Sequence, residues 1–181
     1  MPCRKVILTS ETLQQIVQRL SREITSAFEQ LDSPLALVLL DGAKYFAHDL
    51  LTTIDLPLDV DYIKASSYCG TRSCGTVTFD GDRPLADAIR GRHILLIDDI
   101  YDTGLTLSAL MKWLKTCEPA SIRTCVLLEK QHTHTRQVSV DFVGTPVEDA
   151  FLVGYGLDYN GQYRDLPYIG VLSEERIQKN H

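Results

Sequence analysis

The run at residues 93–107, HILLIDDIYDTGLTL, constrains the fold of this chain more than any other. Its first part, residues 94–97, is continuously apolar and rich in β-branched side chains, which is typical of a strand buried on both faces of a parallel sheet. The acidic pair Asp98 and Asp99 stands where such a strand would end, and after residues 102–106 the apolar residues recur at helical spacing. The pattern predicts a strand, an acidic turn, an anion-binding loop and a helix.

The chemistry of this predicted loop suits a phosphate group. The first turn of a helix has unpaired N–H groups and a partial positive charge. Thr103 and Thr106 add hydroxyl donors, and Gly104 allows the backbone to approach closely. Asp98 and Asp99 would repel a bare phosphate, so we interpret them as groups that face sugar hydroxyls or a magnesium ion. The alternative from the run alone is a solvated acidic turn before a capped helix.

Two long motifs resemble those of one enzyme family. Residues 94–106 resemble the signature by which phosphoribosyltransferases bind phosphoribosyl pyrophosphate (PRPP). Residues 151–160 and 164–171 resemble the C-terminal signature of the hypoxanthine-guanine branch, and the likeness extends from about residue 35 to residue 172. Two long motifs in the right order are more specific than either alone.

The resemblance implies a fold, an activity and a set of partners. The implied fold is α/β, the type I phosphoribosyltransferase fold: a mainly parallel sheet flanked by helices, with a small base-binding hood and a mobile lid loop, in one domain over residues 1–181. The implied enzyme is a purine-salvage glycosyltransferase that transfers the phosphoribosyl group from PRPP to hypoxanthine or guanine, giving IMP or GMP plus pyrophosphate, with Mg²⁺ as cofactor. A homodimer or homotetramer is also implied.

The same resemblance assigns roles around the central loop. Asp98 and Asp99 would meet the ribose hydroxyls, directly or through magnesium, and Asp102 would take the proton from the imidazole nitrogen of the purine. The 5′-phosphate would be held by the loop residues Thr103, Gly104, Leu105 and Thr106.

A second turn suits the leaving pyrophosphate. The apolar strand predicted at residues 35–40 is followed by Asp41, Gly42 and a helix, again an anion-binding geometry. By resemblance this turn holds pyrophosphate, often through a lysine beside the glycine; Asp41 stands there instead, which leaves the backbone amides. Arg164, by resemblance, also contacts pyrophosphate, where its planar fork suits phosphate oxygens. An ordinary turn and a surface arginine are the alternatives.

The purine site is implied by residues further along the chain. Lys130, at the end of the strand predicted at residues 122–128, would contact the 6-oxo group of the purine, although a solvent-exposed charge is the alternative. Phe151 would stack on the base, and the backbone near Leu152 would face its C2 edge. Asp158 would be a magnesium ligand or a strand-end cap.

A small, polar stretch at residues 65–75 reads as a surface loop. By resemblance, Ser67 and Tyr68 lie in the lid, which shields a cationic transition state from water. Cys69 and Cys74 lie in the same stretch, and a redox pair there is an open alternative.

The composition of the chain argues against several classes of protein. The net charge of −6 argues against a nucleic-acid or membrane-surface binder, because those use clustered cationic surface. The five cysteines fit no standard zinc spacing and indicate free thiols in a reducing compartment. No apolar run approaches the length of a membrane span of about 20 residues, and no signal-peptide core is apparent, so we expect a cytoplasmic protein.

The rest of the chain alternates predicted helices and strands. Thr9 or Ser10 would cap a first helix with an apolar stripe on one face. Further strands are predicted at residues 58–64, 77–79, 140–143, 151–155 and 168–172, and a short helix around residues 85–89. This order predicts a mainly parallel sheet with its ligand site at the carboxyl ends of the strands.

Three other functions stay open at this point. A transferase for another base would use the same chemistry. A PRPP-sensing regulator would keep the phosphate loop and lose the base pocket, whereas Lys130 and Phe151 are both present. A phosphoacceptor receiver domain also has paired acids at a strand end, but it does not need the threonine-rich loop.

Overall fold

The computed structural model describes residues 3–67, 77–79, 83–131 and 138–173, with no description of the side chains within residues 65–84. Its main sheet has six strands in the order β4-β3-β2-β5-β6-β7. They are β2 (Pro34–Leu40), β3 (Asp59–Ser67), β4 (Val77–Phe79), β5 (His93–Tyr101), β6 (Ser121–Lys130) and β7 (Phe142–Val147). All neighbours pair in parallel except β4, which runs antiparallel to β3.

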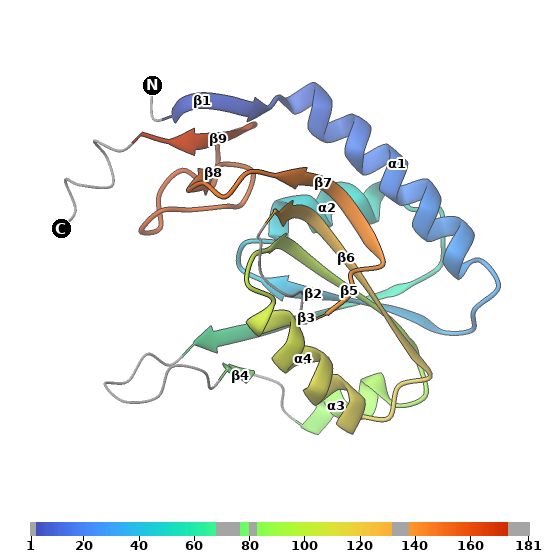
Figure 1. Ribbon diagram of the computed structural model, residues 1–181. Coiled ribbons are helices and arrows are strands. Elements are labelled where there is room, and N and C mark those ends of the chain that lie inside the picture. Colours follow the sequence, from blue (N-terminus) through green and yellow to red (C-terminus); the bar gives the residue numbers. More distant parts are fainter. Residues whose placement is uncertain (1–2, 68–76, 80–82, 132–137, 174–181) are drawn as a thin grey trace.

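Helices cover both faces of this sheet. Figure 1 shows α1 (Ser10–Phe28) and α2 (Lys44–Thr53) above it, with α3 (Arg83–Ile89) and α4 (Leu105–Thr116) below. Successive strand side chains point to opposite faces, so Ala36 and Val38 pack with α1 and α2 while Leu35 and Leu37 pack with α3 and α4. The apolar runs in β2 and β5 are continuous because both faces of these strands are buried.

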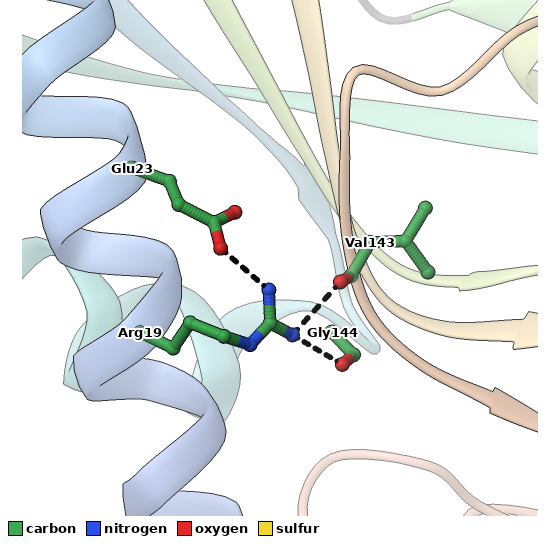
Figure 2. Close-up of polar contacts among 4 residues, drawn as sticks. All are labelled: Arg19, Glu23, Val143 and Gly144. Carbon is green, nitrogen blue, oxygen red and sulfur yellow. Dashed lines mark hydrogen bonds and ion pairs between the residues drawn. The ribbon is translucent and has the colours of Figure 1, made fainter.

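Helix α1 forms where its sequence predicts. The Thr9 side chain accepts a hydrogen bond from the Thr12 backbone N–H at 3.2 Å, which satisfies one unpaired donor of the first turn. The predicted apolar stripe is buried, and Leu20 and Ile24 have no exposed surface. On its polar side, Arg19 donates to the backbone oxygens of Val143 (3.0 Å) and Gly144 (2.5 Å) in β7 and also binds Glu23 (Figure 2). Helix α1 is thereby attached to the edge strand of the sheet.

A second, three-stranded antiparallel sheet has the order β1-β9-β8. Its strands are β1 (Cys3–Leu8), β8 (Leu152–Val153) and β9 (Ile169–Leu172). We call this sheet, together with Phe151, which directly precedes β8, and residues 154–168 between β8 and β9, the hood. Figure 1 shows β1 and β9 side by side at the end of the molecule where α1 begins.

Several strand boundaries differ from the prediction. Strand β5 continues through the acidic pair to Tyr101, because Ile100 and Tyr101 still pair with Leu128 and Glu129 of β6. The strand predicted at residues 151–155 shrinks to β8, since Gly154, Tyr155 and Gly156 all have positive φ. The strand predicted at residues 140–143 begins at Phe142. Among the described residues, no helix is long and apolar enough to cross a membrane.

Candidate active site

A pocket of about 290 Å³ lies at the carboxyl end of β5. It brings together parts of three segments that are distant in sequence: the end of β2 with Gly42, the end of β5, and the loop into α4. Its lining includes seven of the predicted site residues: Gly42, Asp98, Asp99, Asp102, Thr103, Gly104 and Thr106. The prediction that the ligand site lies at strand ends therefore agrees with the location of this pocket.

The loop into α4 has the geometry of an anion site. Gly104 is the N-cap of α4 with φ of 76°, a left-handed conformation, and a Cβ there would lie 2.6 Å from Tyr101 Oη. Because glycine has no side chain to cap the helix, an anion can take that place at the first turn. Leu105 donates its backbone N–H to Thr103 Oγ1 at 3.4 Å, while its own side chain is exposed.

The acidic pair is held in an electrostatically costly position. Asp98 is 8% exposed, and burial, then the charge of Asp99, raise its pKa well above that of an ordinary aspartate. Burial also raises the pKa of Asp99, although hydrogen bonds to its charged form and the Arg164 cation oppose this. The Asp99 N–H donates to Asp98 Oδ1 at 2.8 Å. Sugar hydroxyls or a cation would stabilise the ionised forms of both groups.

These carboxylates fit a magnesium ion only with help from a substrate. Among the side chains that the structure describes, no group of three or more His, Cys, Asp or Glu is arranged to hold a metal. Magnesium is commonly bound by one or two carboxylates plus substrate oxygens, which is the donor set that Asp98 and Asp99 offer. The third predicted ligand, Asp158, is 2.8 Å from Arg164 Nη2 and accepts from the Gly161 N–H at 2.7 Å.

The Gly42 turn packs directly on the acidic pair. A Cβ at Gly42 would collide with the Asp99 carboxylate, so any larger residue there would displace this side chain. The preceding peptide, between Leu40 and Asp41, is cis. The Asp41 side chain is half-exposed and lies 3.3 Å from Lys64 Nζ on β3. Lys64, on the neighbouring strand β3, thus partly offsets the negative charge of Asp41, the residue that departs from the family pattern.

Lys130 lies between two acids at the end of β6. Its side chain is only 14% exposed, and its Nζ lies 3.1 Å from both Asp102 Oδ2 and Asp149 Oδ1. Burial alone would lower the pKa of Lys130, but the hydrogen bonds to Asp149 and Asp102 outweigh it and raise the pKa, so the group stays a cation. Asp149 was not predicted from the sequence. The signal that could have indicated it is an acidic residue just after β7, because the end of β7 pairs with Lys130.

The remaining predicted residues lie in the hood, at the end of β3 or outside the described residues. Phe151 is 51% exposed, with its ring edge-to-face with Tyr159 at 5.3 Å between centroids. Leu152 is buried in the core, so only its backbone is available to a ligand. Arg164 donates to the Gly156 backbone oxygen at 2.6 Å. Ser67 is the last residue of β3, while Tyr68, Cys69 and Cys74 lie outside the described residues.

The fold and pocket define an α/β protein with a candidate anion-binding site at the carboxyl edge of a parallel sheet. A family model described as "Phosphoribosyl transferase domain" matches residues 5–160. The chain belongs to the phosphoribosyltransferase family.

Individual relatives agree with this assignment. The chain is 44% identical over 169 residues to the hypoxanthine-guanine phosphoribosyltransferase of Bacillus subtilis, covering 93% of this chain and 92% of the relative. It is 39% identical over 171 residues to the hypoxanthine-guanine-xanthine phosphoribosyltransferase of Tritrichomonas foetus, covering 94% and 92%.

Solved structures extend the likeness to three dimensions. A hypoxanthine phosphoribosyltransferase from Staphylococcus aureus superposes with a TM-score of 0.89 at 35% identity, over 97% of this chain and 94% of the other. A variant of the Trypanosoma cruzi enzyme complexed with the product IMP gives a TM-score of 0.90 at 30% identity, over 100% and 97%. The predicted type I phosphoribosyltransferase fold is confirmed.

Proposed function

We propose that this protein is a purine-salvage enzyme that transfers the phosphoribosyl group from PRPP to hypoxanthine or guanine, giving IMP or GMP and pyrophosphate. The observation that carries the proposal is the single pocket wall formed by the acidic pair, Asp102 and the loop Thr103–Thr106, in a chain 44% identical to a hypoxanthine-guanine phosphoribosyltransferase. Lys130 reaches the same wall through its contact with Asp102.

The 5′-phosphate would bind at the start of α4. Thr103 and Thr106 would donate their hydroxyls, and Gly104 and Leu105 their backbone N–H groups, with the Leu105 N–H exchanging its 3.4 Å hydrogen bond to Thr103 Oγ1 for one to the phosphate. The left-handed glycine and the exposed Leu105 side chain support this role, because they leave the backbone to the phosphate.

Asp98 and Asp99 would hold the ribose hydroxyls and a magnesium ion. Their raised pKa values support this, because donors and cations relieve the cost of two buried carboxylates. When bound, Mg²⁺ would neutralise charge on the pyrophosphate as it leaves. Asp158 would join the ligands only if its contact with Arg164 opened.

Asp102 and Lys130 would act on neighbouring atoms of the purine. Lys130 would donate to the 6-oxo group, and Asp102 would accept the proton from the adjacent imidazole nitrogen as the bond to C1′ forms. The distance of 3.1 Å between Lys130 Nζ and Asp102 Oδ2 supports these two roles. A planar purine presents its 6-oxo oxygen and its adjacent imidazole nitrogen on one edge, so both side chains can reach the same base. Phe151 would stack on the base, and the Leu152 backbone would face the C2 edge.

The leaving pyrophosphate would lie on the turn at Asp41 and Gly42. Backbone amides and Arg164 would supply its donors. Ser67 and Tyr68 would belong to a lid that closes over the reaction and excludes water.

We also propose a cytoplasmic homodimer or homotetramer that binds neither nucleic acid nor membrane. Free thiols at Cys3, Cys117 and Cys125 support a reducing compartment. Exposed Tyr45, Val60 and Tyr62 side chains beside a groove of about 780 Å³ support association with a second copy. Sedimentation velocity tests this, and a monomer at assay concentration would contradict it.

The activity is tested by incubating the protein with PRPP, Mg²⁺ and hypoxanthine and separating nucleotides chromatographically. We expect IMP and pyrophosphate in equal amounts. PRPP binding without nucleotide from any purine would instead favour a PRPP-sensing regulator, and nucleotide from another base alone would favour a different transferase.

A further inference from the structure

A buried tyrosine in the hood is hydrogen-bonded to a helix of the main sheet. Tyr155 is 8% exposed, and its hydroxyl donates to Asp49 Oδ2 at 2.5 Å. Asp49 lies on α2, 106 positions earlier in the chain. The Tyr155 backbone N–H donates to the Leu166 oxygen at 2.9 Å, so this side chain belongs to a loop that is itself held together.

The residue after Tyr155 rests on the Gly42 turn. A Cβ at Gly156, which has φ of 103°, would collide with the Gly42 backbone oxygen. A Cβ at Gly42 would in turn collide with the Asp99 carboxylate. Hood, turn and strand β5 are therefore in direct contact, and the Asp49–Tyr155 hydrogen bond lies beside this stack, on the helix that the turn begins.

We propose that Tyr155 is a positioning residue, which through its hydrogen bond to Asp49 fixes the hood and its purine-stacking Phe151 against the Gly42 turn and Asp99. This inference rests on the proposed function. In this role Tyr155 fixes the distance between the purine and the sugar carbon that the purine attacks. Tyr155 itself contacts neither substrate.

The chemistry of the pair suits a permanent contact. Burial, then the hydrogen bond to Asp49 and the charge of Asp49, raise the pKa of Tyr155 well above that of an ordinary tyrosine. The hydroxyl therefore stays protonated and remains a donor throughout the pH range of an enzyme assay.

Loss of the hydrogen bond between Tyr155 and Asp49 should affect how the two substrates are aligned with each other. A misplacement of about 1 Å in a bound reactant costs about 10²-fold in rate. The 5′-phosphate loop begins α4, which packs on the opposite face of the sheet from α2 and Tyr155. Loss of the hydrogen bond should therefore lower kcat and leave PRPP affinity unchanged.

The test uses three variants that remove the hydrogen bond: Tyr155→Phe, Asp49→Ala and the double variant that carries both changes. They are compared with Asp49→Asn, which keeps an oxygen that accepts from the tyrosine. Tyr163→Phe, at a partly exposed tyrosine of the same hood loop, is the matched control. We expect Tyr155→Phe and Asp49→Ala each to lower kcat roughly 10- to 100-fold. The double variant should be no slower than either single one, because both remove one interaction.

Asp49→Asn and Tyr163→Phe should stay within about twofold of the parent in kcat, and calorimetric PRPP affinity should be unchanged in all variants. A kcat for Tyr155→Phe equal to that of the parent, additive effects in the double variant, or an equal loss in Asp49→Asn would each overturn the proposal. If Tyr155→Phe does not fold, the Asp49→Ala and Asp49→Asn pair still decides it.

Hydrogen exchange separates this inference from the proposed function. If the parent forms no nucleotide, the proposed function fails, but the positioning contact remains testable. Tyr155→Phe should speed amide exchange in residues 154–166 and 42–47 and not in α4. Unchanged exchange in both segments would show that the hydrogen bond does not hold the hood.

Discussion

Asp102→Asn separates proton transfer from every other role of this side chain. The asparagine keeps an oxygen that accepts from Lys130 Nζ, now 3.1 Å from Asp102 Oδ2, but it cannot take a proton from the purine. Because the Asp102 side chain is 45% exposed, its ion pair contributes only about 0–1 kcal/mol to the free energy of unfolding. For a chain of this size that is a shift of at most about 4 °C in Tm.

Catalysis should change far more than stability. A general base contributes about 10²–10⁴-fold, so we expect single-turnover rates with hypoxanthine to fall by that factor. Calorimetric PRPP affinity should be unchanged. Asp149→Asn is the matched control, because Asp149 binds the same Lys130 atom at the same distance and has no proposed proton to take. Rates within a few-fold of the parent, or an equal loss in Asp149→Asn, would refute the general-base role.

Four further predictions follow from the pocket. Thr106→Val should weaken PRPP binding by about 1.5–3 kcal/mol if its hydroxyl holds the phosphate, and unchanged calorimetric affinity would argue against that role. Asp41→Lys should tighten pyrophosphate product inhibition, because it replaces an anion at the turn by a cation; indifference of this inhibition would place pyrophosphate elsewhere. Among four bases at saturating PRPP and Mg²⁺, kcat/KM should be highest for hypoxanthine and guanine, well below them for xanthine, and near zero for adenine, whose 6-amino donor would face the Lys130 donor at a cost of at least about 1–3 kcal/mol. Adenine as the best substrate would overturn the role of Lys130, and xanthine as the best would overturn the carbonyl edge at C2. Asp98→Asn should raise the Tm of the ligand-free protein, and should raise it more at pH 8 than at pH 5. The reason is that the pKa of Asp98 is raised in the folded state, so the ionised carboxylate destabilises the fold as the pH rises through that pKa. Calorimetric scans at both pH values measure the difference.

The sequence predicted the elements whose signals are local. The buried strands β2, β5 and β6 are continuous apolar runs, and the stripe of α1 repeats at helical spacing, so each can be recognised within its own segment. The loop residues 102–106 could be placed for the same reason, because strand, glycine and helix follow one another directly.

The features that escaped prediction depend on distant partners. Strand β1 has only one buried residue and pairs with β9 at the other end of the described chain, which no local pattern reveals. The end of β5 was predicted too early because polar Asp98 and Asp99 suggested a turn, whereas pairing with β6 keeps the backbone extended. The contacts Lys130–Asp149 and Tyr155–Asp49 join side chains that only the folded sheet order brings together.

The charges around the pocket show how an acidic protein can hold a polyanion. Asp98, Asp99 and Asp102 line the pocket, and two cations close to them are engaged with other acids: Lys130 with Asp102 and Asp149, and Arg164 with Asp158. Within the described part of the chain, these two side chains are therefore not free to balance the charge of PRPP. Backbone N–H groups carry no net charge and cost no counter-ion, so the helix N-terminus and the Gly42 turn can bind phosphates beside carboxylates. On the proposed function, the negative charge of the acidic pair would then favour the ribose hydroxyls and a divalent cation over a further bare phosphate at this position.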